Sequence, residues 1–291
     1  MAIFELIYQF MNNFSFLILA ALGLAIIFGM MGIINLAHGE FIMLGAYMTT
    51  IATASGIPLP LSILIAAAGV GLFGLIVDRI IIKRLYGRTL DSVVVTWGIS
   101  MILSQGILII FGPSLEGVST PLGSIAIAGA SYSTYRILLF FIALFMLGMI
   151  YWLFTRTKFG LYSRATMQNH DIARTMGINT NKMYSFTFML GAALAGLAGG
   201  LYAPTMAVSP TFGTAFLMPS FVTVIVGGAN PLIGTSLSGG ILGVVNSALD
   251  ILWGTFYGKL GLLVVAIIVI RLLPLGFSGL VEKKLMRGRG I

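Results

Sequence analysis

The sequence predicts an all-α integral membrane protein, a polytopic bundle of about eight or nine transmembrane helices. The chain is 58% hydrophobic and 8% charged, whereas an ordinary soluble domain carries roughly 25% charged residues. A mean hydropathy of +1.06 leaves too little polar surface to cover a water-soluble globule. The apolar residues run in long unbroken stretches, unlike the short alternating segments of a β-barrel. With no cysteine present, disulfides, thiolate metal sites and a cysteine nucleophile are excluded.

The unbroken apolar stretches give the expected spans, because a helix needs about 20 residues to cross the hydrocarbon layer. We treat the whole chain as one transmembrane domain, and we expect no removable signal peptide, since Glu5 is the only early charge. The stretch 215–229 is short, so we expect a half-span or a broken helix there. The predicted spans are 9–31, 33–56, 58–82, 92–112, 136–155, 184–206, 215–229, 232–253 and 260–281.

Most of the 16 basic residues lie in three segments, 79–88, 156–182 and 283–289. Positive residues accumulate on the cytoplasmic side of membranes, so we expect all three segments, and with them the C-terminus, to be cytoplasmic. The net charge of +8 therefore reflects membrane asymmetry and not nucleic-acid binding. The loop 112–135 carries only Glu116 as a charge, and we expect an external connection without catalytic residues.

The densest group of polar residues inside a predicted span is Asn35, His38 and Glu40, which lie among glycines at 32–40. Ionisable side chains are costly within a bilayer, so each one is a candidate for function. A break in the helix would expose backbone groups to a cavity, as in transporter binding sites. The alternative is that these side chains only hydrogen-bond to neighbouring helices. For His38, a structural or path-lining role is favoured over a catalytic or metal role.

A second region interrupted by Gly and Pro covers 199–213 and continues to 227–231. Interrupted hydrophobic segments in both halves of a chain are typical of inverted-repeat transporters, so an inverted repeat is possible here. An ordinary external loop followed by a tight turn is the alternative, which we prefer for Asn230-Pro231. For Asp250 and Arg271, near span ends, we expect interfacial snorkelling.

Thr96, Trp97, Ser100, Ser104 and Gln105 lie along the fourth span, and positions 97, 100, 101, 104 and 105 form one stripe. This stripe has helical spacing and can face a solute pathway. The same residues can equally provide the hydrogen bonds that join helices in lipid.

The loop 156–182 is the longest segment predicted to be cytoplasmic. Leu161, Ala165, Ile172 and Met176 lie at helical spacing, which predicts one short amphipathic helix. Gly177 is suited to the position after its end, and Asn179 or Thr180 to the cap of the next helix. From spacing alone, this helix rests on anionic lipid through its arginines.

The sequence contains no complete motif for energy conversion or catalysis. Gly254 to Lys259 approaches a P-loop, but the spacing differs and no Ser or Thr follows the lysine. Neither a zinc-protease motif nor a nucleophile elbow is present. Uphill transport would therefore need energy from another polypeptide. The alternative is a stand-alone channel or secondary carrier for a small neutral solute, and an intramembrane enzyme has no positive support.

Three groups of residues in register resemble the permease subunits of LIV-type ABC importers, which take up branched-chain amino acids, urea or short amides. The resemblance extends from about residue 20 to Gly276, nearly the whole chain. The first group is Gly32, Asn35, Ala37, His38, Gly39, Glu40, Met43, Gly45, Ala46 and Tyr47. The second is Gly160, Leu161, Arg164, Ala165, Gln168, Asn169, Ala173, 177–180, Thr187, Phe188, Gly191, Ala192 and 196–199. The third is Val226, Gly227, Gly228, Gly234 and Thr235.

The resemblance implies a non-catalytic permease domain in a multi-pass, bacterial-type inner membrane. Its implied partners are a second related permease, giving a heterodimer, two cytoplasmic ATPases, and a periplasmic or lipid-tethered solute-binding protein. No cofactor is expected in this chain, since ATP and magnesium are bound by the ATPases. The segment 165–169 is more similar to the urea and short-amide branch than to the leucine branch.

The resemblance also assigns site residues. It implies that the loop 156–182 couples the permease to an ATPase. The expected solute-pathway residues are Asn35, His38, Glu40, Thr96 and Trp97. The expected coupling residues are Arg164, Gln168, Asn169, Asp171, Ala173, Arg174 and Gly177.

Overall fold

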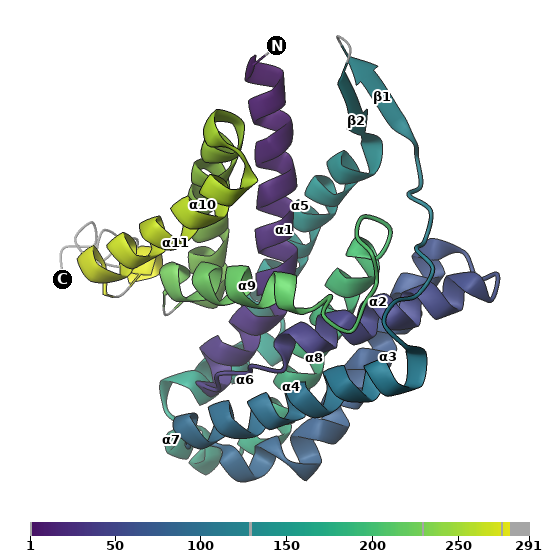
Figure 1. Ribbon diagram of the computed structural model, residues 1–291. Helices are drawn as coiled ribbons and strands as arrows, with labels where there is room; N and C mark the ends of the chain where they lie inside the picture. The colour runs from purple at the N-terminus through teal and green to yellow at the C-terminus, as the bar shows by residue number, and fades with distance from the viewer. Residues whose placement is uncertain (1, 128–129, 229, 275, 280–291) are drawn as a thin grey trace. The chain divides into compact units, whose positions relative to one another are not determined.

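The computed structural model describes residues 2–127, 130–228, 230–274 and 276–279 (Figure 1). Within this part of the chain, the regular structure consists of helices and one small hairpin. The helices are α1 (Ala2–Met31), α2 (His38–Ala54), α3 (Leu59–Ile80), the 3-10 helix η1 (Ile82–Leu85), α4 (Thr89–Phe111), α5 (Thr134–Arg156), α6 (Lys158–Gln168), α7 (His170–Thr175), α8 (Thr180–Tyr202), α9 (Thr214–Gly227), α10 (Pro231–Trp253) and α11 (Thr255–Leu272). The strands are β1 (Ser124–Ile127) and β2 (Ala130–Ser133).

Each of the nine predicted apolar stretches coincides with a helix: α1 to α5 and α8 to α11. Among the described residues, seven helices are long and apolar enough to cross a membrane. The other two, α2 with 17 residues and α9 with 14, are shorter. The prediction of an all-α polytopic membrane protein is confirmed, including the short helix after residue 214.

The chain divides into two compact units, which are described separately. The α2–α4 unit consists of Leu22–Thr120 and Met149–Met218. The α10–α11 unit consists of Met1–Ala21, Pro121–Gly148 and Pro219–Ile291. Helices α1, α5 and α9 each begin in one unit and end in the other.

The core of the α2–α4 unit is α8 packed against α2 and α3. The backbones approach so closely that side chains are excluded: a Cβ on Gly45 would overlap the backbone of Gly196, and one on Gly199 would overlap the carbonyl oxygen of Ile42. Small residues of this kind drive helix association in lipid, where burial of apolar surface gives no advantage. The buried rings of Phe41 and Phe188 then meet edge to face, with centroids 5.9 Å apart.

The α10–α11 unit is built on the contact between α10 and α11. Asp250 of α10 accepts a hydrogen bond from the side-chain nitrogen of Asn13 in α1, at 3.0 Å. The prediction that Asp250 snorkels at the interface is therefore replaced by an interhelical polar contact. The hydrophobic core of this unit comprises Leu17, Val222, Val226, Leu242, Leu262 and Ala266.

The β1–β2 hairpin lies in the loop 112–135, for which the sequence analysis predicts no strand. Its strands pair antiparallel, with Ser124 opposite Ser133. The backbone N–H of Ser133 donates to the hydroxyl of Tyr8 in α1 at 3.1 Å, and Tyr132 packs edge-on against Tyr8, with ring centroids 4.9 Å apart. The hairpin is anchored by residues more than a hundred positions away, which local sequence patterns do not reveal.

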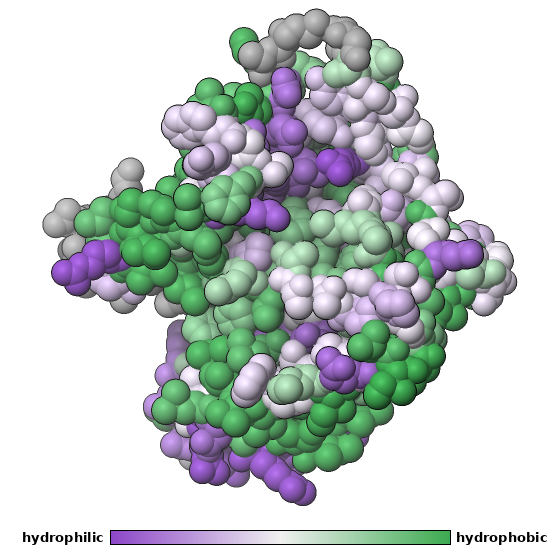
Figure 2. All heavy atoms as spheres, in the orientation of Figure 1, coloured by the Kyte–Doolittle hydropathy of each residue, from purple (hydrophilic) through white to green (hydrophobic). Residues whose placement is uncertain are grey.

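Large apolar side chains cover the outward surfaces of α4 and α11 (Figure 2). Ile109 of α4 is 83% exposed in this chain, and Ile267 of α11 is 68% exposed. Water would not tolerate such surfaces, so they suit helices that meet lipid or another apolar subunit.

We expect Gly199→Leu to destabilise the permease fold, because the new side chain would meet the backbone of α2. Overpacking of a tight core costs about 1–3 kcal/mol, and here backbone atoms block relaxation. The matched control is Gly98→Leu in α4, where an added Cβ meets nothing within 4 Å. Melting curves of the detergent-purified variants should show a lower transition for Gly199→Leu alone. Equal transitions would contradict the packing described here.

Candidate functional site

The predicted helix break lies between Met31 and His38. Gly32 takes a φ of +63°, which favours glycine and ends α1. The side-chain oxygen of Asn35 accepts a hydrogen bond from the N–H of Ala37 at 3.1 Å, in a turn that leads into α2. The sequence prediction of a broken segment here is confirmed.

Asn35, His38 and Glu40 are all buried at this break, with relative exposures of 0%, 0% and 5%. The His38 ring lies beside α1, since a Cβ on Gly23 would come within 3.2 Å of its Cε1 atom. The carboxylate of Glu40 accepts a hydrogen bond from the Ser100 side chain of α4. Its second oxygen, Oε2, has no hydrogen-bond partner within the described part of the chain. A buried carboxylate with a free oxygen is costly unless something else binds it.

The second interrupted region meets the first. Helix α8 ends at Tyr202 and α9 begins at Thr214, so 203–213 is a non-helical connection. A Cβ placed on Gly39, in the first turn of α2, would lie 2.7 Å from the carbonyl oxygen of Gly213. Two segments far apart in sequence, each identified by its glycines, therefore touch through their backbones beside Glu40.

Thr96 and Trp97 lie on different sides of α4. Thr96 is fully buried, and its hydroxyl donates to the carbonyl of Ser92 at 2.7 Å and accepts from the N–H of Leu36 at 3.0 Å. Thr96 thus holds the break in place. Trp97 is 58% exposed on the outer surface of the chain.

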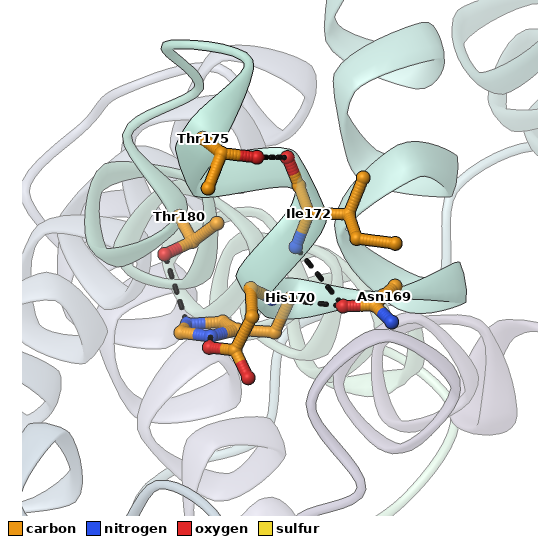
Figure 3. A network of polar contacts seen from close by, with 6 residues as sticks. Asn169, His170, Ile172, Thr175 and Thr180 are labelled. Atoms are coloured by element: carbon orange, nitrogen blue, oxygen red, sulfur yellow. Dashed lines mark hydrogen bonds and ion pairs between the residues drawn. The ribbon is translucent and has the colours of Figure 1, made fainter.

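The loop between α5 and α8 forms two helices, α6 and α7, where the sequence predicts one. The division occurs at Asn169, whose extended backbone cannot continue a helix. Its side-chain oxygen accepts hydrogen bonds from the N–H groups of Asp171 and Ile172, at 3.1 and 3.0 Å, and so caps α7 (Figure 3). Asparagine competes in this way with helix continuation, which the apolar spacing does not reveal.

The predicted ends of this loop are confirmed. Gly177 has a φ of +85°, and its N–H donates to the carbonyl of Arg174 at 3.0 Å, which closes α7. Asn179 caps α8 by accepting a hydrogen bond from the N–H of Lys182 at 3.0 Å. Proline at Gly177 would lack both the conformation and the donor.

The apolar residues of α6 and α7 face outward. Leu161, Ile172 and Met176 are 55%, 57% and 75% exposed, while Ala173 is buried. Of the other predicted coupling residues, Gln168, Asn169, Asp171 and Arg174 are exposed. Arg164 is also exposed, and one of its guanidinium nitrogens hydrogen-bonds to the carbonyl of Phe154. The two helices therefore present an apolar, partly charged surface that nothing in the described chain covers.

A partly buried polar network, which the sequence analysis did not identify, connects α7 with α3 and α8. The His170 ring stacks on Tyr184 with centroids 5.7 Å apart and lies 2.9 Å from the hydroxyl of Thr180 (Figure 3). The Tyr184 ring meets Tyr86 edge-on, with centroids 4.9 Å apart. Tyr86 and Ser185 donate hydrogen bonds to Asp78 of α3, at 2.7 and 2.6 Å.

This network also brings two basic loops together. Tyr86 belongs to the connection between α3 and α4, and Tyr184 to the first turns of α8, so 79–88 and 156–182 lie at the same end of the α2–α4 unit. Burial raises the pKa of Tyr86, and its hydrogen bond to the Asp78 carboxylate raises it further. The phenol therefore stays protonated and remains a donor at neutral pH.

Comparison with known proteins identifies the class. Residues 6–273 match the family described as the permease component of branched-chain amino acid transport systems. The chain belongs to this permease family. It is a multi-pass membrane permease, and because its relatives are named as transport permeases, it is a non-catalytic transport subunit.

The relatives extend over nearly the whole permease. It is 31% identical to a probable branched-chain amino acid permease, LivH, of Methanocaldococcus jannaschii, over 94% of this chain and 91% of that protein. It is 26% identical to the branched-chain amino acid permease BraD of Pseudomonas aeruginosa, over 90% and 91%. A ribose import permease, RbsC of Haemophilus influenzae, is 25% identical over 75% and 69%. No solved structure gives a significant match.

We expect Asp78→Ala to destabilise the permease, because it removes the acceptor of two partly buried hydroxyls, those of Tyr86 and Ser185. Leaving each hydroxyl without a partner costs about 1–3 kcal/mol. The control is Asp91→Ala, which breaks an exposed ion pair with Arg88 (2.7 Å), of a kind that contributes about 0–1 kcal/mol. In thermal unfolding of purified protein, only the first variant should unfold several degrees earlier. An equal change in both would contradict a structural role for Asp78.

Proposed function

We propose that this permease carries branched-chain amino acids across a bacterial-type inner membrane, driven by ATP hydrolysis in partner subunits. The observation that supports this most strongly is the match over 6–273 to permeases of such systems. Relatives that align with nine-tenths of the chain or more carry the names of branched-chain amino acid permeases. On these grounds we place branched-chain amino acids before urea and short amides as the solute.

We further propose that α6 and α7 form the docking surface for a cytoplasmic ATPase. The exposed Ile172 and Met176 support this, since an amphipathic helix that served only the fold would turn such residues inward. Leu161 adds to the same apolar surface, and Arg174 contributes charge. The His170–Tyr184 stack connects α7 with α8, so force applied to α7 would reach α8.

The two basic loops indicate which end of the permease faces the cytoplasm. Because the basic loops 79–88 and 156–182 lie together, the positive-inside rule places both in the cytoplasm. Four helices, α8 to α11, follow the loop 156–182, and we propose that all four cross the membrane, which makes the C-terminus cytoplasmic as well. Its basic residues at 283–289 lie outside the described residues.

Along the pathway, we propose that Asn35, His38 and Glu40 line the route, close to the Gly39–Gly213 contact. Thr96 holds this break in place. We assign Trp97, exposed on the outer side of α4, to contact with the second permease subunit at the edge of the route. A solute-binding protein delivers the solute from outside.

Transport in reconstituted vesicles tests the proposal. The permease, its ATPases and a second permease are placed in liposomes with leucine-loaded binding protein outside. We expect leucine to accumulate only with ATP, and vesicles with this chain alone to stay tight to leucine. Accumulation by the chain alone would instead indicate a secondary carrier. ATP-driven uptake of urea but not leucine would contradict the proposed solute.

Docking has its own test. We expect Met176→Glu combined with Ile172→Glu to abolish co-purification of the ATPases, because two charges would replace the apolar contacts of the docking surface. Removing two interface anchors typically costs several kcal/mol, or about a hundredfold or more in affinity.

The control for docking is Leu122→Glu, at a residue that is 62% exposed in the predicted external loop. That variant should retain the ATPases fully. If the α7 variant also retains them, the docking surface lies elsewhere.

A further inference from the structure

Buried polar atoms without a partner are concentrated on α2. Within the described part of the chain, Glu40 Oε2 and the hydroxyls of Tyr47, Thr49 and Thr50 are buried and make no hydrogen bond. Each buried polar group without a partner lowers the free energy of unfolding by about 1–3 kcal/mol, and folded proteins contain few such groups. Four on one helix of 17 residues therefore call for an explanation.

Two of these groups, on Glu40 and Tyr47, face the same neighbour, and Thr50 lies at the edge of that face. Successive helix residues turn by about 100°, so Tyr47 projects within about 20° of Glu40 and Thr50 within about 80°. Ser100 bonds to the Glu40 carboxylate, and the Phe111 ring lies 5.6 Å from that of Tyr47. Both Ser100 and Phe111 belong to α4, so this face of α2 is directed at α4.

Thr49 lies on the opposite side of the helix. Its hydroxyl would be 2.5 Å from a Cβ placed on Gly200, so it faces α8. Packing against a closely approaching backbone accounts for Thr49, whereas no such backbone contact accounts for Glu40, Tyr47 and Thr50.

The charge on this face has no counterpart nearby. Neither α2 nor α4 contains a lysine or an arginine. A solute with an ammonium group would supply the missing positive charge and bind Oε2 through a charge-assisted hydrogen bond. Urea or a short amide carries no such charge, and a branched-chain amino acid does.

The distances between Glu40, Tyr47 and Thr50 along α2 indicate how a solute would move past them. Glu40 and Tyr47 are about 10 Å apart along the axis, and Thr50 is about 4.5 Å further on. The ammonium and carboxylate of an amino acid are only two bonds apart, so one molecule meets these groups in succession. Met43 and Leu44 lie between them on the same side and offer apolar surface to a branched side chain.

We propose that Glu40, Tyr47 and Thr50 form a track on the α4-facing side of α2 along which an α-amino acid passes, with Glu40 Oε2 binding its ammonium group. This inference rests on the proposed function and adds Tyr47 and Thr50 as residues that determine which solute passes. The track is closed in this conformation, and α4 must move away from α2 to admit the solute.

The test uses the reconstituted complex with its ATPases, second permease and binding protein. The variants are Glu40→Gln, Tyr47→Phe and Thr50→Val, each close in shape to the original residue. The matched control is Thr49→Val, which removes a buried hydroxyl from the opposite face of α2. Leucine uptake and ATP hydrolysis stimulated by the loaded binding protein are both measured.

We expect Glu40→Gln to lower leucine uptake about tenfold or more, and Tyr47→Phe and Thr50→Val about threefold to tenfold, as loss of one polar contact to a moving solute predicts. Stimulated ATP hydrolysis should stay within about twofold of wild type, because docking is intact. Thr49→Val should change neither rate. Should Glu40→Gln not assemble, Tyr47→Phe and Thr50→Val decide the question together.

Two results would overturn the track: uptake unchanged in the three variants, or an equal loss in Thr49→Val, which would indicate a structural role for the whole helix. Failure of the proposed function would give a different result. The wild-type complex itself would then import no branched-chain amino acid.

Discussion

The α2–α4 unit depends on the close approach of α8 to α2 and α3. Because Gly196 and Gly199 have no side chains, backbone meets backbone, and the position of α2 is set by steric exclusion and not by side-chain choice. This contact fixes the position of α2 and, with it, the polar side of α2 that faces α4. It also fixes the start of α8, where Tyr184 and Ser185 contact the C-terminal end of α3 and its connection to α4. One helix thus packs against both α2 and the α3–α4 connection.

The two regions that α8 contacts differ in chemistry. At the start of α8, Asp78 accepts two hydrogen bonds and Tyr86 keeps its proton. Such a network is rigid. Along α2, by contrast, Glu40 and Tyr47 keep unpartnered atoms in the interior. The permease thus combines a rigid connection at the start of α8 with unsatisfied polar atoms on α2.

Much of this fold follows from sequence, because lipid imposes long apolar helices and glycines mark the places where they break. All nine helices, the break before His38, the cap at Asn179 and the turn at Gly177 are of this local kind. The division at Asn169 was missed, since the spacing of apolar residues does not report a side chain competing for backbone donors. The hairpin and the Asp78 network were missed because their partners, Tyr8 and Ser185, lie over a hundred residues away. Likewise, the resemblance assigns both Thr96 and Trp97 to the solute pathway, and only the packing of α4 shows that Thr96 is buried and Trp97 exposed.

The composition of α2 also has a consequence for biogenesis. At 17 residues, with His38 and Glu40 in its first turn, it is shorter and more polar than a segment that partitions into lipid alone. We therefore expect α2 to insert into the membrane only together with later helices. Its principal partner, α8, is synthesised more than a hundred residues afterwards. The polar groups that suit a solute thus delay membrane insertion, and the nascent chain is most exposed to quality-control proteases in that interval.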